Sequence, residues 1–248
     1  MLHEIGFPKR FYYYYLGTLY QFTYYTTTHK LLGFRYSLLF KLLAIMFVLA
    51  AWVFDWGQVP LIILIALLVW IYLAYWRARK SGYYKFIGGK PAQPDGQDYQ
   101  KLPPYEPIPC LATGFFSVQD WEKRVLLKPA DYWQVPHGDH ALMVEHLPHK
   151  YLYQFFNVAG IKDFQHGWLL HGSHPKPALS ISFLSIWGPE FAKELFSIFR
   201  SEPKPVQPIV RTIYLSFSSD EEEELIFQNI LRDIQQFSRK EKTAESAD

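Results

Sequence analysis

The chain has 248 residues, of which 50% are hydrophobic and 19% aromatic, with 25 Lys and Arg against 23 Asp and Glu. The length allows one membrane unit plus one ordinary soluble domain. Residues 1–109 hold 11 basic and 5 acidic side chains, whereas residues 110–248 hold 14 and 18, and the acidic second half argues against nucleic acid as a partner. A single cysteine, Cys110, excludes an intrachain disulfide and agrees with a reducing compartment.

The first predicted element lies within an N-terminal segment of residues 1–37 and consists of a run of Tyr, Phe and Thr at 11–28. The run lacks the charge that a free tail would show, and it is too polar and too β-prone for a spanning helix. Two interpretations fit it equally. It is either an interfacial element with its rings at head-group depth, or a short strand or hairpin packed on the soluble domain.

Residues 38–76 are predicted to form a two-helix transmembrane hairpin, because apolar runs at 38–54 and 61–76 flank a turn at 55–60. Both runs are slightly shorter than the about 20 residues of a typical spanning helix, and both can cross with little tilt. Lys41 lies only one turn inside the first run, so its long stem can reach the head groups. The alternative is a pair of buried core helices in a soluble protein.

Basic residues flank the hairpin on both outer sides, whereas its turn carries Asp55 and no Lys or Arg. The positive-inside rule therefore predicts an integral protein of the cell inner membrane with both termini in the cytoplasm. The basic residues expected to face lipid are Lys9, Arg10, Lys30, Arg35, Arg77, Arg79 and Lys80.

Residues 77–109 are rich in Pro and Gly and predict an extended, solvated linker. From Cys110 onward, short β-type runs alternate with turn residues. Strands are expected at 111–118, 124–127, 141–145, 151–157, 168–171, 179–184 and 211–217, interrupted by a short helix within 187–208.

The last predicted element is an amphipathic helix from about Asp220 to Phe237. Ser218 or Ser219 is expected to cap it, ahead of an acidic first turn that suits the helix dipole. Residues 238–248 are expected to be a disordered tail.

Seven short strands closed by one C-terminal helix resemble the pleckstrin-homology fold. The stretch 151–184 carries the resemblance with a strand, a turn at GIKDFQHG and two further strands, and RTIYLSFSSDEEEELIFQNIL supplies the last strand and helix. The whole chain is similar to bacterial proteins that join a membrane hairpin to a cytoplasmic pleckstrin-homology-like domain. The resemblance implies an α+β domain at 110–237, a barrel capped by the helix. It also implies head-group contact in the first strand hairpin, where the chain offers Lys123, Arg124 and Lys128.

Seven of the nine histidines fall between His137 and His174, and the motifs HGDH and HGSH echo each other. Their four histidines, His137, His140, His171 and His174, are candidate ligands for zinc or another transition metal, with Asp139 and Asp163 nearby in sequence. The alternative is that both motifs are turns between strands. The spacings match no standard zinc signature, so no metal or other cofactor is expected.

The chain has no P-loop, nucleophile elbow, H-E-x-x-H or G-x-G-x-x-G motif, so we do not expect an enzyme. We expect a membrane-anchored cytoplasmic binding or scaffolding module that recognises a protein or lipid partner. Its partners would be the lipid bilayer and either another membrane protein or a second copy of the chain. The alternative function is a metal-dependent, membrane-bound hydrolase that uses the histidines between His137 and His174.

Overall fold

The computed structural model describes residues 6–91, 105–118, 121–135, 139–147, 150–185 and 209–245. The chain divides into two compact units. The helical unit contains residues up to Ile87 together with Leu169–Lys176, and the sheet unit contains Gly88–Trp168 and everything from Pro177 onward.

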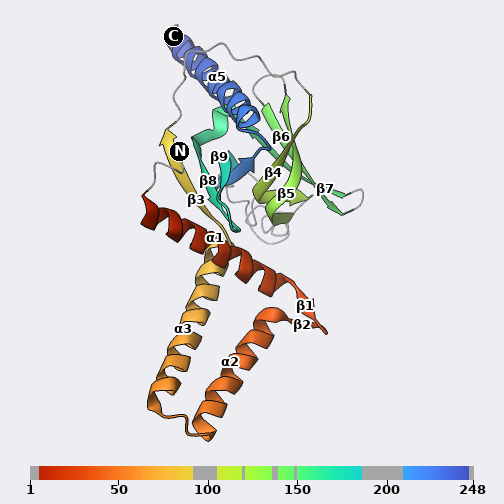
Figure 1. The fold of residues 1–248 in the computed structure, drawn as a ribbon. Coiled ribbons are helices and arrows are strands. Elements are labelled where there is room, and N and C mark those ends of the chain that lie inside the picture. The colour runs from red at the N-terminus through yellow and green to blue at the C-terminus, as the bar shows by residue number, and fades with distance from the viewer. Residues whose placement is uncertain are drawn as a thin grey trace, which may run out of the picture. The chain divides into compact units, whose positions relative to one another are not determined.

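The helical unit consists of three helices and a small strand hairpin. In chain order these are α1 (Phe7–Thr28), β1 (Lys30–Leu31), β2 (Phe34–Arg35), α2 (Tyr36–Val53) and α3 (Gln58–Ser81). Helices α2 and α3 run side by side in opposite directions, and α1 lies across the ends that are far from their connecting turn (Figure 1). In that turn Asp55 and Gly57 have φ values of 46° and 88°, left-handed conformations that reverse the chain within a few residues.

Helices α2 and α3 are long and apolar enough to cross a membrane, as the sequence predicted. Their mean hydropathy reaches 2.1 and 2.4, and only 6% of each apolar stretch is buried. Core helices of a soluble protein would be mostly buried, so this alternative does not fit the structure. Helix α3 runs beyond the predicted end at Trp76 and stops at Gly82, which has the left-handed conformation typical of a helix C-terminus.

The aromatic N-terminal run is a helix, so the alternative of a strand or strand hairpin is wrong. Its threonines, which favour strands, are accommodated because their hydroxyls donate back to carbonyls in the preceding turn. Thr23 donates to Leu19 at 2.9 Å and Thr27 to Thr23 at 2.7 Å. The helix buries Leu16 and Tyr20 against α3, and this packing outweighs the β propensity of the run.

The sheet unit is built on one large antiparallel sheet and one helix. Its strands are β3 (Lys85–Pro91), β4 (Ile108–Val118), β5 (Trp121–Val135), β6 (Asp139–Leu147), β7 (Lys150–Asn157), β8 (Ile161–Leu170), β9 (Lys176–Ser185) and β10 (Ile209–Ser216), followed by α5 (Asp220–Glu245). Each of the seven strands predicted after Cys110 overlaps one of these. A single-turn 3-10 helix, Val158–Gly160, joins β7 to β8. The strand order is β3-β8-β9-β10-β4-β5-β6-β7.

The predicted barrel is not closed. Over the described residues, the end strands β3 and β7 do not pair with each other, and β7 returns to β4 only at Ser117 and Tyr153. The outer edge of β8 is occupied by β3, which begins within the segment predicted to be a linker. The linker prediction is therefore wrong for Lys85–Pro91, and residues 92–104 lie outside the described part.

Two further boundaries differ from the sequence predictions. GIKDFQHG is not a turn, because β8 already begins at Ile161 and buries Phe164. Helix α5 continues through Glu245, so residues 238–245 are not a disordered tail; they include Arg, Lys, Glu and Ala, which favour helix, and no Gly or Pro. The short helix predicted within 187–208 lies outside the described residues.

The core of the sheet unit forms between one face of the sheet and α5. Strand β9 shows the predicted alternation, with Leu179, Ile181 and Phe183 fully buried. Helix α5 adds the buried side chains Ile226, Phe227 and Ile230. Of the two predicted caps, Ser219 is the one that fits, because its hydroxyl accepts a hydrogen bond from the Glu222 backbone at 3.1 Å.

Candidate functional site

The helical unit contains a basic pocket. It has a volume of about 550 Å³ and lies where the end of α1, the β1–β2 hairpin, the start of α2 and the end of α3 meet. Four cations line it: Lys30 and Arg35 from the hairpin, Lys41 from α2 and Arg79 from α3. The other lining residues are Thr27, Thr28, Ser37, Tyr72, Tyr75, Trp76 and Tyr83.

The pocket carries positive charge that no residue lining it offsets. None of its lining residues is acidic. Within residues 6–87, the one acidic side chain in the sequence is Asp55, in the turn at the opposite ends of α2 and α3. The pocket therefore favours an anion, most of all one with several charges.

Short contacts between helices fix the aromatic wall of the pocket. The Tyr75 hydroxyl on α3 lies 2.6 Å from the Thr26 hydroxyl on α1, a hydrogen bond that either group can donate. The Lys41 ammonium lies 5.9 Å from the centre of the Tyr75 ring, within cation–π range. Outside the lining residues, the Tyr25 ring stacks on the His29 ring at 4.0 Å and lies 5.9 Å from the Tyr36 ring. The charges are thus presented from ordered elements.

The structure brings together three of the seven basic residues that sequence analysis expected to face lipid. Lys30, Arg35 and Arg79 line the pocket, whereas Lys9, Arg10, Arg77 and Lys80 are not among its lining residues. Sequence analysis missed Lys41 as a member, although a lysine inside an apolar span is itself a signal of function. It was explained only by its reach to the head groups.

The three residues proposed for head-group contact lie on β5, in the other unit. Arg124 is exposed, and its guanidinium carbon lies 5.5 Å from the centre of the Phe115 ring. Arg211, which sequence analysis did not single out, lies 5.1 Å from the same ring. Lys123 and Lys128 lie on the same strand, five residues apart. Head-group contact at these residues stays a prediction.

The described histidines of the proposed metal cluster have other contacts. His140 is fully buried, with Nδ1 2.8 Å from the Tyr132 hydroxyl, whose pKa is raised well above its usual value, chiefly by burial. His171 Nδ1 donates to the Tyr83 carbonyl at 2.8 Å, and burial lowers the pKa of this imidazole. His174 is exposed beside Ser173, with 2.9 Å between Nδ1 and the hydroxyl.

The structure supports the turn interpretation of HGSH, because residues 171–175 connect β8 to β9. His137 lies outside the described residues. In the part of the chain that is described, no three His, Cys, Asp or Glu side chains are grouped so that they could hold a metal ion.

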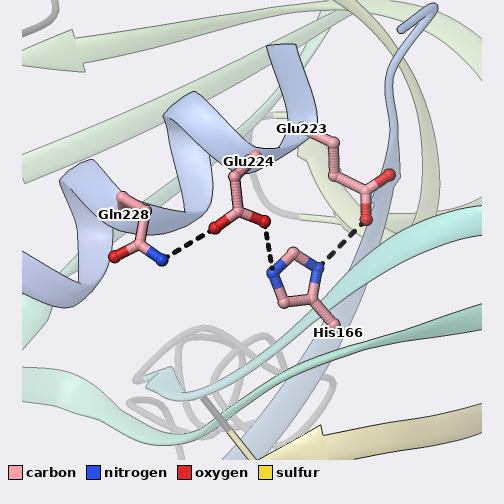
Figure 2. A network of polar contacts seen from close by, with 4 residues as sticks. All are labelled: His166, Glu223, Glu224 and Gln228. Atoms are coloured by element: carbon pink, nitrogen blue, oxygen red, sulfur yellow. Dashed lines mark hydrogen bonds and ion pairs between the residues drawn. The ribbon is translucent and has the colours of Figure 1, made fainter. Parts of the chain in front are cut away.

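A polar cluster ties the start of α5 to β8. His166 places Nδ1 3.3 Å from Glu223 Oε1 and Nε2 3.4 Å from Glu224 Oε2, and Gln228 donates to Glu224 at 2.7 Å (Figure 2). The His166 ring also packs on Phe227, with 3.6 Å between ring centres. The acidic run is thus the first turn of a helix, as predicted, and two of its members also hold that turn to the sheet.

A row of exposed aromatic rings runs along β7. Tyr151, Tyr153 and Phe155 alternate with buried residues, so all three point to the same side of the strand. The Tyr153 and Phe155 rings are stacked 6.1 Å apart, and Phe155 remains 66% exposed. β7 is also an end strand of the sheet.

The chain was compared with protein-family models, curated proteins and solved structures, and none of them matches.

Proposed function

We propose that this chain is a membrane-anchored binding protein of the cell inner membrane with both termini in the cytoplasm. The observation that carries the proposal is the exposure of α2 and α3. Residues along both helices, such as Met46 at 63% and Ile62 at 63%, expose large apolar side chains. Water penalises such surface by about 25 cal/mol per Å², whereas lipid tails do not.

The charges support this orientation. The end of the helical unit that carries Lys30, Arg35 and Arg79 is basic, whereas Asp55 is the one charged residue in the turn between α2 and α3. Helix α1 lies across the ends of α2 and α3, so with those helices spanning the bilayer it would lie along the membrane surface (Figure 1). Five of its six exposed rings gather on the face opposite Leu16 and Tyr20: Phe7, Phe11, Tyr15, Phe22 and Tyr25. The sixth, Tyr12, lies one turn before Leu16 on the same face. Aromatic rings favour that depth.

Membrane topology is tested with single cysteines in a Cys110→Ala background. A cysteine replacing Gln58, at the start of α3, is expected to react with a membrane-impermeant maleimide in intact cells. A cysteine replacing Ala244 is expected to react only after the membrane is permeabilised. The reverse pattern, or release of the protein from membranes by alkaline carbonate, would refute the anchoring.

The sheet unit is proposed to be the cytoplasmic binding module, of pleckstrin-homology-like type. The order of seven strands and then a helix supports this assignment, whereas the extra strand β3 and the open sheet depart from it. The aromatic row of β7 is the surface we assign to a protein partner, a second copy of the chain, because exposed Tyr and Phe are enriched at interfaces and these three rings lie on one side of the strand.

Cross-linking in native membranes tests this surface. Replacing Tyr153 and Phe155 with Ser should abolish the cross-linked dimer, while replacing the exposed Lys162 on β8 with Ser should leave it unchanged. A dimer that survives the first change would exclude β7 as the contact.

A further inference from the structure

The basic pocket of the helical unit combines a concentrated charge with a position at the end of two apolar helices. Given the membrane anchoring proposed above, we propose that this pocket binds the head group of a phospholipid that carries two phosphates. The argument rests on the charge of the pocket, its size and the place from which Lys41 enters it.

The charge selects a polyvalent anion. Lys30, Arg35, Lys41 and Arg79 supply four formal positive charges, and no described residue lining the pocket is acidic. One phosphate diester, with a single negative charge, would leave most of this charge without compensation. Two phosphates balance half of it, and Arg35 and Arg79 can each bind phosphate oxygens through paired N–H groups.

The size and lining fit a head group better than a simple ion. A volume of about 550 Å³ lies within the range of small-molecule sites. The hydroxyls of Thr27, Thr28 and Ser37 line it as well, and they can bond phosphate or glycerol oxygens. The rings of Tyr72 and Trp76 add an apolar wall against which the glycerol backbone can pack.

The place of Lys41 favours a lipid over a soluble phosphate compound. This residue lies within the first two turns of α2, a helix whose surrounding side chains are apolar and exposed. A lysine there is costly in a bilayer, and an anionic lipid at head-group depth offsets that cost. The acyl chains of such a lipid can continue along the exposed apolar faces of α2 and α3, which a soluble phosphate would leave unused.

Native mass spectrometry of the full chain, released from nanodiscs, tests the proposal. Nanodiscs are made with equal amounts of phosphatidylcholine and one probe lipid, either cardiolipin with two phosphates or phosphatidylglycerol with one. The variants are Lys41→Gln and Arg35→Gln. Lys41→Gln removes a charge from an apolar span and so should not impair insertion. The matched control is Arg77→Gln, which removes the same charge from the same end of α3 but outside the pocket.

We expect one cardiolipin retained per chain, at least tenfold above phosphatidylcholine and several-fold above phosphatidylglycerol. Each pocket variant should reduce this retention about tenfold, and Arg77→Gln should leave it within twofold. Equal retention of both anionic lipids would overturn the two-phosphate assignment. Equal loss in Arg77→Gln would overturn the location.

Two further experiments complete the test. One distinguishes a lipid from a soluble phosphate compound, and the other tests the membrane anchoring separately from the pocket. Millimolar glycerol 3-phosphate should not displace the retained cardiolipin, and displacement would identify a soluble ligand instead of a lipid. The cysteine labelling described above is independent of the pocket, so a chain with the expected topology but no lipid preference refutes this inference alone. A chain with the wrong topology refutes the proposed anchoring.

Discussion

Replacing Gly17 with Ala should loosen the segment Leu169–Lys176 from the helices of its own unit. Gly17 lies on the buried face of α1, and its carbonyl accepts a hydrogen bond from the Gly172 backbone at 2.9 Å. A Cβ atom at Gly17 would lie 2.5 Å from the Gly172 carbonyl oxygen. Ordinary contact needs about 3.4 Å or more, so Gly172 must retreat by about 1 Å. That movement breaks the hydrogen bond.

The free-energy cost of this change has two parts, the lost hydrogen bond and the partial exposure of Leu170. The lost hydrogen bond is worth about 1 kcal/mol. Leu170 is fully buried against Leu16, Tyr20 and Ala78, and partial exposure forfeits part of the roughly 1.5–3 kcal/mol that burying a leucine contributes. The segment should therefore open more easily by about 2 kcal/mol, about a thirtyfold change in its opening equilibrium. The higher helix propensity of Ala acts on α1 in both states and cancels.

Hydrogen exchange of the Gly172 amide in detergent-solubilised protein measures this opening. Exchange should accelerate about thirtyfold in Gly17→Ala. Thr18→Ala is the matched control, because Thr18 is exposed on the same helix and the change raises helix propensity without adding an atom at the contact. If Gly17→Ala exchanges at the rate of the control, the close approach of Gly17 to Gly172 is not what holds the segment.

The remaining predictions concern groups whose burial has a measurable consequence. Burial lowers the pKa of His171 in the folded protein, so the stability that His171 gives to the docking of Leu169–Lys176 should be complete above about pH 6.5 and decline below it. The decline is measured as faster exchange of the Gly172 amide, after correction for intrinsic exchange rates. An exchange rate that does not change with pH after this correction would contradict the prediction. Ile230→Ala should destabilise the sheet unit by about 2–4 kcal/mol in chemical denaturation, whereas the exposed Gln236→Ala should change it by less than about 0.5 kcal/mol. Burial raises the pKa of the Cys110 thiol to about 12, so alkylation at pH 8 should be at least tenfold slower in the folded protein than in denaturant, and equal rates would exclude the buried site.

Sequence patterns predicted elements best where one physical signal dominates. Two apolar runs around a turn left few alternatives to a helical hairpin, and period-two alternation located strands such as β7 and β9. The start of α5 was equally well marked by Ser219 and the acidic residues after it. Each of these signals is local, so it needs no knowledge of what the segment packs against.

Predictions failed where distant segments decide the outcome. The aromatic run of α1 has β propensity, yet it becomes a helix because Leu16 and Tyr20 pack against α3 and Leu170. The segment around Lys85 looked like a linker, and only its pairing with β8 makes it a strand. That pairing also occupies the edge through which a barrel would have closed. Composition cannot reveal either partner.

The candidate site could be predicted only in part, because it too depends on how distant segments pack. Three of its four cations could be listed from their places beside the hairpin, but their convergence depends on how α1, α2 and α3 come together. Lys41 was assigned to the head-group region without a partner. In the structure Lys41 lines a pocket with three other cations. The free-energy cost of placing this lysine in an apolar span must therefore be considered together with their repulsion.

A lysine in the apolar part of a span costs up to about 2.5–3.5 kcal/mol, and less near the helix end because the stem extends to the head groups. Extension alone would direct the ammonium away from other cations, since like charges repel. Lys41 instead lines the same pocket as Lys30, Arg35 and Arg79, in a unit whose single acidic side chain within residues 6–87, Asp55, lies at the other end of the hairpin. An anion that enters the pocket would relieve the repulsion among these four cations. If α2 and α3 span a bilayer as proposed, the abundant anions at the depth where they leave it are lipid phosphates. Under the two proposals made above, the anchor and the binding site would be the same part of the molecule, and the hairpin would both hold the protein in the bilayer and select the lipid around it.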